Sequence, residues 1–537
     1  MDTLFEAVAR GAKLNPSAAA LAHVNGTTSY ADLHRTVLRV ADALRTRGIG
    51  RDDVIALQLP NSLPFVVLLL AAGALGATVQ MLHMPYRRAE LASLLRHGGA
   101  SVYVGLTHFK EESPLATVEG FDLVRQCFSG EDAPAAEGSD NNDAAAGGAA
   151  VAAAIAADGP PSWTRLFREG NEAAAFTPPD PDSRYVLLHT SGTTADPKCV
   201  PVSHRCFIGN ASASLAPLQI GATDVLLAAA PFTHLYGLFV LEMGLLAGAC
   251  ISLMPAFTPP ALVAVLEHDR VTALFGGPAH VRPLLLLSPA ALASAVASLR
   301  LVCLSGTAVP PELAQATEAI LPQGKVIQLW GMSELQAGSY GRPEDPARLR
   351  HFTAGRPSPG TRLRIRPEDN GAAERSGTSG NASAEGPVQV RGPSLFSGYL
   401  DNPAATAAAF EDGWFNTGDL GYLSADGALV LTGRIKEIIN RGGIKFNPID
   451  IEAIIDRLPG VVHSAIVPMP DPVLGERACA FVQADRAVTL DEVKAALDLA
   501  GVARFKWPER LEQVAEMPTT PTRKIMRGRL TAMLAAM

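Results

Sequence analysis

The segment LLHTSGTTADPKCVP, residues 187 to 201, places small hydroxyl residues and a glycine between an apolar strand and Lys198. Such residues leave backbone N–H groups open to a ligand, and a lysine a few residues later adds a positive charge, so the loop suits a phosphate chain. A polar turn after a buried strand is the alternative interpretation. The Walker pattern requires a second glycine before the lysine. This chain has Pro197 there, so the loop alone does not distinguish a phosphate-binding loop from a polar turn.

Two later segments carry groups that a nucleotide needs. LWGMSE, residues 329 to 334, combines an aromatic ring and a glycine with a hydroxyl and the Glu334 carboxylate. A ring can stack on a purine, a hydroxyl can reach a phosphate, and a carboxylate can bind Mg²⁺. GWFNTGD, residues 413 to 419, ends in Asp419, an acceptor for two ribose hydroxyls. The alternatives are a strand end with a chance acidic residue and an ordinary turn aspartate.

Basic residues mark two segments near the C-terminus. GRIKEIINRGGIKFNP, residues 433 to 448, joins cations to the flexible pair Gly442 and Gly443, and PTTPTRKIMRGRL, residues 518 to 530, contains Lys524. Each alone is more typical of a solvated surface than of a site.

Charge and composition limit the classes of function. The chain has 537 residues, which indicates several domains or subdomains. With 45 Lys and Arg against 53 Asp and Glu, the formal charge is −8, and this balance disfavours nucleic-acid binding. A polyphosphate ligand would therefore need locally placed cations.

The cysteines and the longest hydrophobic run indicate the cellular compartment and whether the chain crosses a membrane. The six cysteines are scattered without C-x-x-C pairs, so we expect free thiols in the cytoplasm. The N-terminus lacks a signal-peptide pattern. Residues 65 to 84 are nearly long enough to span a bilayer, but their Gly and Ala spacing favours a core helix followed by a buried strand. We therefore predict no transmembrane segment.

Periodicity predicts an α/β protein. Helix-like and strand-like patterns alternate through most of the chain, which favours a substantially parallel sheet whose strand ends carry the site. Residues 129 to 160, rich in Ala, Gly, Asp and Asn, are interpreted as a flexible surface insertion, and residues 367 to 386 as a loop joining two strands. Thr489 and Glu492 have capping-box spacing. We predict a large domain over 1–433, built of α/β subdomains, and a small α+β domain over 437–537.

All these segments, in this order, resemble the adenylate-forming superfamily of acyl-CoA synthetases, adenylation domains and luciferases. TSGTTADPK is similar to its phosphate loop, PFTHLYGL to its acyl-pocket segment, SGTAVP and LWGMSE to its adenine and Mg²⁺ segments, GWFNTGD to its ribose segment, GRIKEIINRGG to its hinge, and PTTPTRKIMRGRL to its C-terminal lysine segment. The resemblance covers essentially the whole chain and is strongest to fatty, alicyclic or aromatic acid CoA ligases.

The resemblance implies ATP and Mg²⁺ as cofactors and CoA as co-substrate. It implies phosphate binding by Thr190, Ser191, Gly192, Thr193, Thr194 and Lys198; adenine binding by Gly306, Thr307, Ala308, Trp330, Gly331 and Met332; ribose binding by Asp419 and Arg434; and a Mg²⁺ ligand in Glu334 beside Ser333. Lys524 would bridge the acyl carboxylate and the α-phosphate. The hinge would be 434–436, with rotation about Lys436 bringing Gly442 and Gly443 to the CoA tunnel.

The acid pocket is expected to be lined by His234, Gly237, Phe275, Gly276, Gly277 and Met332. His234 also suits a satisfied core histidine. PFTHLYGL holds no aspartate to pair an α-ammonium group, which disfavours an α-amino acid.

Four residues depart from the family pattern: Trp330 replaces Tyr, Ser333 replaces Thr, Cys199 replaces Gly after the loop lysine, and Arg523 replaces the Gly before Lys524. None removes a chemical group, but Cys199 and Arg523 affect the expected loop behaviour.

Three functions remain. The first is an AMP-forming acid–CoA ligase, the second an adenylation enzyme that loads the phosphopantetheine thiol of an acyl carrier protein, and the third a non-catalytic nucleotide-binding protein. The expected partners are a small carboxylic acid and either CoA or a carrier protein. No nucleic-acid partner is expected. The sequence leaves open whether the chain forms a homodimer. Serine hydrolase and zinc peptidase motifs are absent.

Overall fold

The computed structural model describes residues 3–109, 113–119, 121, 124–130, 162–189, 198–366, 382–441, 444–520 and 524–537. The predicted insertion falls outside these residues from position 131 onward, as does most of the loop 367 to 386.

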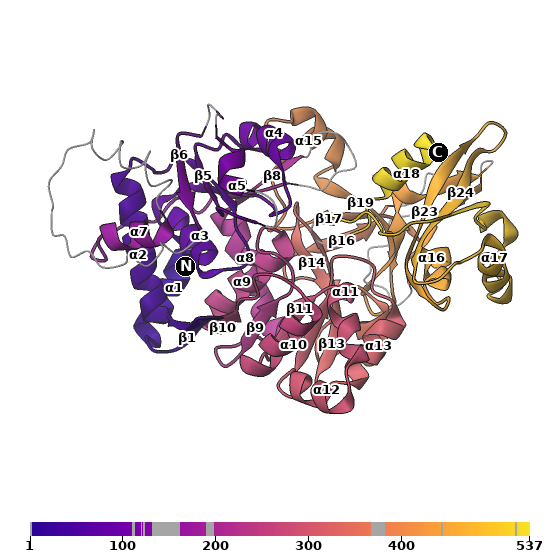
Figure 1. The fold of residues 1–537 in the computed structure, drawn as a ribbon, viewed down its shortest axis with the longest axis horizontal. Coiled ribbons are helices and arrows are strands. Elements are labelled where there is room, and N and C mark those ends of the chain that lie inside the picture. The colour runs from indigo at the N-terminus through magenta and orange to yellow at the C-terminus, as the bar shows by residue number, and fades with distance from the viewer. Residues whose placement is uncertain are drawn as a thin grey trace.

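Two sheets of mainly parallel strands form the large N-terminal part (Figure 1). The first has nine strands in the order β15-β14-β13-β12-β11-β9-β10-β1-β2. Their bounds are β1 Ala19–His23, β2 Gly26–Ser29, β9 Val225–Ala228, β10 Cys250–Ser252, β11 Ala273–Gly276, β12 Leu301–Leu304, β13 Lys325–Met332, β14 Gln336–Tyr340 and β15 Arg356–Pro357.

The second sheet has six strands in the order β6-β5-β3-β4-β7-β8, and only the β7 and β8 pair is antiparallel. Their bounds are β3 Val54–Gln58, β4 Thr78–Met81, β5 Val102–Gly105, β6 Gln126–Ser129, β7 Arg184–His189 and β8 Cys199–Ser203. The phosphate-loop segment therefore follows a strand of this sheet, whereas LWGMSE ends a strand of the nine-stranded sheet.

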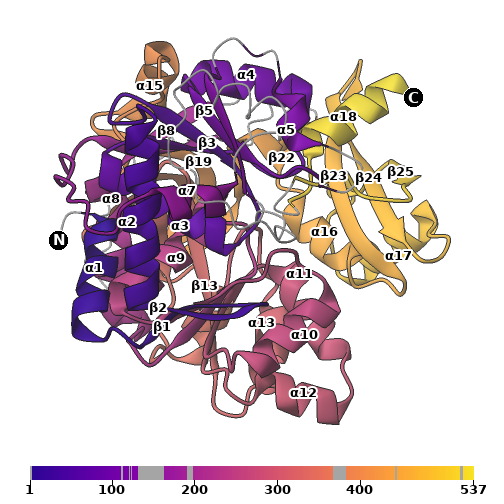
Figure 2. The ribbon, with the colours of Figure 1, turned by 60° about the vertical axis from the view of Figure 1, so that its left-hand side comes forward.

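The helices of this part cover both sheets, and one hydrophobic core runs through them. Helix α8 contacts strands of both sheets, while α10, α12 and α13 lie together beside the nine-stranded sheet (Figure 2). Their bounds are α1 Leu4–Leu14, α2 Tyr30–Thr46, α3 Leu63–Leu75, α4 Arg88–Gly98, α5 Pro114–Thr117, α7 Trp163–Glu169, α8 His204–Leu218, α9 Leu235–Ala247, α10 Pro259–His268, α11 Pro278–Val281, η1 Arg282–Leu286, α12 Pro289–Val296, α13 Pro311–Ala319 and α14 Ala347–Phe352.

The run that resembled a membrane span is a core helix and a strand, as predicted. Helix α3 begins at the N-cap Ser62, whose hydroxyl accepts the Phe65 N–H, and ends at Gly76 in the left-handed conformation. Its residues from Phe65 to Ala74 are all buried. Within the described residues, no helix has both the length and the apolarity to cross a bilayer.

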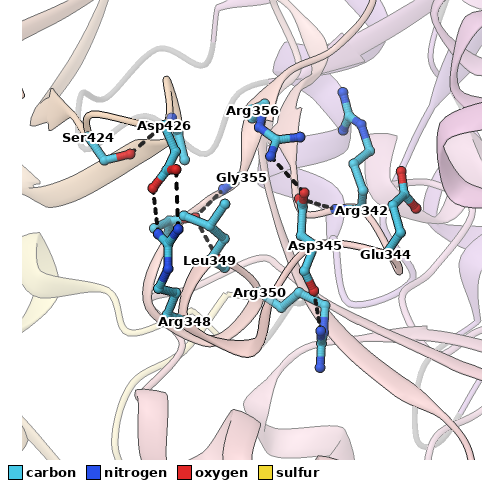
Figure 3. A network of polar contacts seen from close by, with 12 residues as sticks. Arg342, Glu344, Asp345, Arg348, Leu349, Arg350, Gly355, Arg356, Ser424 and Asp426 are labelled. Carbon is cyan, nitrogen blue, oxygen red and sulfur yellow. Dashed lines mark hydrogen bonds and ion pairs between the residues drawn. The ribbon is translucent and has the colours of Figure 1, made fainter. Parts of the chain in front are cut away.

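A third, antiparallel sheet carries the ribose segment. It contains β16 Arg362–Ile365, β17 Gly386–Arg391, β18 Phe410–Glu411, β19 Trp414–Leu423 and β20 Leu429–Arg434, with α15 Pro403–Ala409 between β17 and β18. Figure 3 shows the polar contacts beside α14: Arg348 pairs with Asp426 in the β19–β20 turn, and Arg356 pairs with Asp345. The Arg348–Asp426 pair links α14 to the turn that follows β19, the strand that carries Asp419.

The small C-terminal domain has separate hydrophobic cores around its own sheet. It lies opposite the N-terminal helices in Figure 1. Its elements are η2 Ile435–Glu437, β21 Ile439–Arg441, β22 Ile444–Phe446, α16 Ile449–Ile455, β23 Val461–Asp471, β24 Gly475–Ala484, α17 Leu490–Leu499, η3 Arg504–Lys506, β25 Arg510–Gln513 and α18 Arg527–Ala536. The predicted fold class, a large α/β part and a small α+β domain, is confirmed, while the exact boundaries at 433 and 437 stay a prediction.

Candidate active site

The segment PFTHLYGL is held against the six-stranded sheet by buried polar side chains. Asn61, which follows β3, donates to the Ala230 carbonyl at 3.1 Å and accepts the Phe232 N–H at 2.6 Å. His83, which follows β4, contacts the Thr233 hydroxyl at 2.9 Å through Nδ1. The strand-end rule points to Asn61 and His83, but the sequence analysis had not singled them out.

His234 is the N-cap of α9, and its Nδ1 accepts the Tyr236 N–H at 3.2 Å. Burial and the nearby Lys524 ammonium lower the pKa of His234 to about 4, so the ring is neutral at physiological pH. Because Nδ1 accepts, the proton of the neutral ring lies on Nε2. His234 can therefore donate a hydrogen bond through Nε2 at the N-terminus of α9. The backbone at Gly237 leaves no room for a side chain, since a Cβ would lie 2.3 Å from the Pro231 carbonyl oxygen.

The other acid-pocket residues occupy different environments. Phe275 is fully buried in β11 and packs edge-on to Tyr236, so its side chain belongs to the hydrophobic core. At Gly277, a Cβ would lie 2.9 Å from the Ser305 carbonyl oxygen. Gly277 thus lets the chain after β11 approach the chain after β12, beside the adenine segment, whereas the side chains nearest to Gly276 are those of His280 and Ala229.

The adenine segment is open to solvent at the end of β12. Gly306 has φ +92°, and Gly306, Thr307 and Ala308 are all exposed. Gly331 is exposed too, and a Cβ there would meet the Gln336 carbonyl oxygen at 2.1 Å, so the β13–β14 approach requires glycine. Trp330 is different, because only 7% of its surface is exposed.

Asp419 is the acceptor at the centre of the ribose segment. It is 5% exposed, Trp330 Nε1 donates to its Oδ2 at 2.8 Å, and Arg434 Nε donates to its Oδ1 at 2.7 Å. Each carboxylate oxygen has a second lone pair, so both can still accept a ligand hydroxyl. The structure therefore brings together Trp330, Asp419 and Arg434, which the sequence placed in separate segments.

Glu334 and Lys198 meet around a residue that the sequence analysis missed, Tyr399. The Tyr399 hydroxyl donates to Glu334 Oε1 at 2.9 Å, and Lys198 Nζ lies 4.4 Å from the Tyr399 ring centroid. Burial raises the pKa of Glu334, while the Tyr399 hydrogen bond and the Lys198 charge oppose that rise. No sequence pattern singles out Tyr399, because it lies in a loop distant from both partners.

Glu334 has the chemistry of a Mg²⁺ ligand. It is a desolvated carboxylate beside the candidate phosphate-binding lysine, and Mg²⁺ prefers oxygen ligands from one or two carboxylates plus phosphates. Among the described residues, no group of three or more His, Cys, Asp and Glu side chains is placed to hold a metal ion. The remaining ligands would therefore come from the nucleotide and water. Met332 and Ser333, adjacent in the chain, are half-buried.

Lys524 enters this site from the small domain. It lies in a hairpin in which Thr520 N–H donates to the Lys524 carbonyl at 2.7 Å and Lys524 N–H donates to Thr520 Oγ1 at 3.1 Å. Burial and the Arg434 charge lower the pKa of Lys524, and the carboxylates of Glu437 and Asp419 oppose this. The charges that act on it thus come from Asp419 of the ribose segment, from Arg434 and Glu437 around the hinge, and from Arg527 of α18.

Part of the predicted hinge region can be placed in the structure. Lys436 is exposed in η2, and Arg527 of α18 pairs with Glu437 at 3.3 Å. The predicted residues Thr190, Ser191, Gly192, Thr193, Thr194, Gly442 and Gly443, together with Arg523, lie outside the described residues.

Comparison with known proteins identifies relatives along the whole chain. A family model described as AMP-binding enzyme matches residues 8–400, and one described as AMP-binding enzyme C-terminal domain matches residues 450–524. A 2-hydroxy-7-methoxy-5-methyl-1-naphthoate–CoA ligase of Streptomyces carzinostaticus is 32% identical, over 98% of this chain and 92% of its own. A salicyl-AMP ligase / salicyl-S-ArCP synthetase of Mycobacterium tuberculosis is also 32% identical, over 93% and 84%.

The fold has close counterparts among solved structures. The ATP-bound crystal structure of MatB from Rhodopseudomonas palustris superposes with a TM-score of 0.80 at 25% identity, covering 98% of both chains.

Proposed function

Because the chain belongs to the family of AMP-binding enzymes, we propose that it is an acid–thiol ligase that activates a carboxylic acid with ATP to an acyl-AMP, releases pyrophosphate, and transfers the acyl group to CoA. The observation that supports this most is the position of Lys524. An ammonium from the small domain lies within electrostatic reach of His234 and Asp419 of the large domain and of Arg434 at the start of the predicted hinge.

The first step requires charge neutralisation above all. A carboxylate that attacks the α-phosphate meets like-charge repulsion, so catalysis depends on positioning and on cations. Lys524 would neutralise the attacking carboxylate and the α-phosphate together. His234, neutral and with a proton on Nε2, would donate to the acyl carboxylate or to the α-phosphate without adding charge.

The nucleotide would be held by three groups of residues. Gly306, Thr307, Ala308 and Gly331 would take adenine, Asp419 with Arg434 would take the ribose hydroxyls, and Lys198 with the loop before it would take the β- and γ-phosphates. Mg²⁺ bound by Glu334 would neutralise charge on the phosphates. In the second step the small domain would rotate about Lys436, withdrawing Lys524 and admitting the thiol past Gly442 and Gly443.

The acid class is inferred from two of the relatives. The naphthoate-CoA ligase and the salicyl-AMP ligase both act on aromatic acids by name. We therefore propose an aromatic monocarboxylic acid, in a cytoplasm that keeps the six cysteines free.

A carrier-protein thiol is the second candidate acceptor. It is favoured by the relative named as a salicyl-S-ArCP synthetase. Both acceptors share the first step, so only acceptor preference separates them.

Pyrophosphate release from Mg-ATP tests this function. A panel of benzoic, naphthoic, cinnamic and aliphatic acids is assayed with and without CoA. We expect strong release for one aromatic class, rising with CoA as acyl-CoA accumulates. Release that does not respond to CoA favours the carrier protein, and no release with any acid contradicts an adenylating enzyme.

Lys524→Ala separates the two steps. We expect pyrophosphate release to fall by about two orders of magnitude or more, as when a positioned transition-state charge is removed. Thioester formation from supplied acyl-adenylate should persist, because Lys524 is withdrawn in that step. Adenylation near the wild-type rate would contradict the assignment of Lys524.

A further inference from the structure

The loop between β17 and α15 connects the two segments that carry Lys198 and Glu334. Phe396 N–H donates to the Glu334 carbonyl at 2.8 Å, and Leu400 N–H donates to the carbonyl of Cys199, the residue after Lys198, at 3.0 Å. A single short loop thus sets the spacing between a strand end of the six-stranded sheet and a strand end of the nine-stranded sheet.

Tyr399 projects from this loop in a fixed orientation. Its N–H donates to Thr406 Oγ1 at 2.9 Å, and its ring packs edge-on to Phe396 with centroids 4.8 Å apart. With backbone and ring both held, the hydroxyl reaches Glu334 and the ring face lies under Lys198.

Lys198 and Glu334 would otherwise attract each other. Their charges interact, yet among the described residues neither a hydrogen bond nor an ion pair joins them. Tyr399 supplies each with a separate partner: its hydroxyl satisfies the carboxylate, and its ring attracts the ammonium through a cation–π contact. A direct Lys198–Glu334 ion pair would have to be broken before the two groups could bind phosphate and metal.

We propose that Tyr399 is a positioning residue that keeps the Lys198 ammonium and the Glu334 carboxylate apart and oriented, so that the first receives the nucleotide phosphates and the second the Mg²⁺. This rests on the proposed function, since it assumes that Mg-nucleotide is the ligand. It adds a residue outside the recognised segments to the machinery of that site.

The test measures binding without turnover. The affinity of a non-hydrolysable ATP analogue is determined by isothermal titration calorimetry, without acid, in the absence and the presence of Mg²⁺. The ratio of the two affinities is the gain due to the metal. If the wild-type protein binds no nucleotide in either condition, the proposed function fails. If it binds and shows a gain, the variants test Tyr399 alone.

Tyr399→Phe removes the hydroxyl and keeps the ring. We expect the gain due to Mg²⁺ to fall about tenfold, because one hydrogen bond to a charged ligand group is lost, while metal-free affinity stays within about twofold. Tyr399→Leu removes both partners and lets Lys198 pair with Glu334. We expect it to weaken metal-free binding as well, by about fivefold.

Tyr340→Phe is the matched control. Tyr340 is fully buried, and its hydroxyl donates to Ser214 Oγ at 2.9 Å, away from the site. A variant that loses only such a buried bond should melt at a lower temperature with an unchanged gain due to Mg²⁺. A Tyr399→Phe protein that behaves in the same way, or that weakens nucleotide binding equally with and without Mg²⁺, overturns the proposal.

Discussion

At the scale of single residues, we expect Trp330 to act on a nucleotide through Asp419 rather than through its ring. An indole with 7% of its surface exposed has little face left for stacking, but its N–H donates to one oxygen of Asp419, the proposed ribose acceptor. Together with Arg434, it fixes the plane of the Asp419 carboxylate before a ligand arrives. Preorganised acceptors bind more tightly because less freedom is lost on binding.

Trp330→Phe tests this coupling. The variant keeps a ring and loses the donor, so we expect affinity for ATP to fall about five- to tenfold and affinity for 2′,3′-dideoxy-ATP to change by less than about twofold. In an Asp419→Asn background, Trp330→Phe should have little further effect, and this double-mutant cycle measures the coupling. Equal weakening for both nucleotides would show that contact with the base dominates.

At the scale of elements, the strand pattern between Tyr185 and Trp330 was predictable because it depends on local hydrophobicity. The apolar runs in that region form β7, β9, β10, β11, β12 and β13. The division of these strands between two sheets was not predictable, because pairing of β7 with β4 and of β9 with β10 depends on long-range packing. The contact of Tyr399 with Lys198 and Glu334 was not predictable from the sequence for the same reason.

Capping patterns show a similar limit. Thr489 caps α17 as predicted, accepting the Glu492 N–H at 3.2 Å. Glu492 does not complete the capping box, since its carboxylate pairs with Arg486. When a carboxylate has two available donors, tertiary geometry decides from which it accepts. The spacing of residues in the sequence does not encode that geometry.

Helix α9 contains a carboxyl group that the proposed mechanism does not use. Glu242 is fully buried, neither of its oxygens has a hydrogen-bond partner among the described residues, and burial raises its pKa far above the usual range. In the unfolded chain this group ionises near pH 4.5, whereas in the folded protein it keeps its proton. The folded state thus binds more protons, and stability falls as pH rises above that value.

Glu242→Met should stabilise the large domain by about 1–3 kcal/mol at pH 8, because an unpaired buried polar group is replaced by an apolar one of similar size. The decline in unfolding free energy from pH 6 to 8 should flatten by up to about 1.4 kcal/mol per pH unit. Urea unfolding at both pH values measures this. Glu242→Gln is the control, which should flatten the pH dependence yet leave an unpaired amide. A pH dependence unchanged by either variant would contradict the prediction.

At the scale of the whole molecule, the small domain is positioned so that Lys524 lies within electrostatic reach of His234 and Asp419 of the large domain. Polar contacts cross between the two parts. Arg457, just after α16, pairs with Glu312 of α13, and Arg282 of η1 acts electrostatically on Asp456. The order of motifs predicted two domains, but their relative orientation depends on these surface charges and was not predictable from the sequence.

Glu312→Arg should shift this arrangement, because it places two cations together where an ion pair now forms. Both side chains are mostly exposed, at 60% and 64%, so the effect should be modest: pyrophosphate release falls about two- to fivefold, and less at high salt. Thioester formation from supplied acyl-adenylate should be unchanged or faster, since that step needs Lys524 withdrawn. The charge-swapped Glu312→Arg/Arg457→Glu protein should regain adenylation. If the single variant slows both steps equally, or the swap restores nothing, these charges do not govern the domain arrangement.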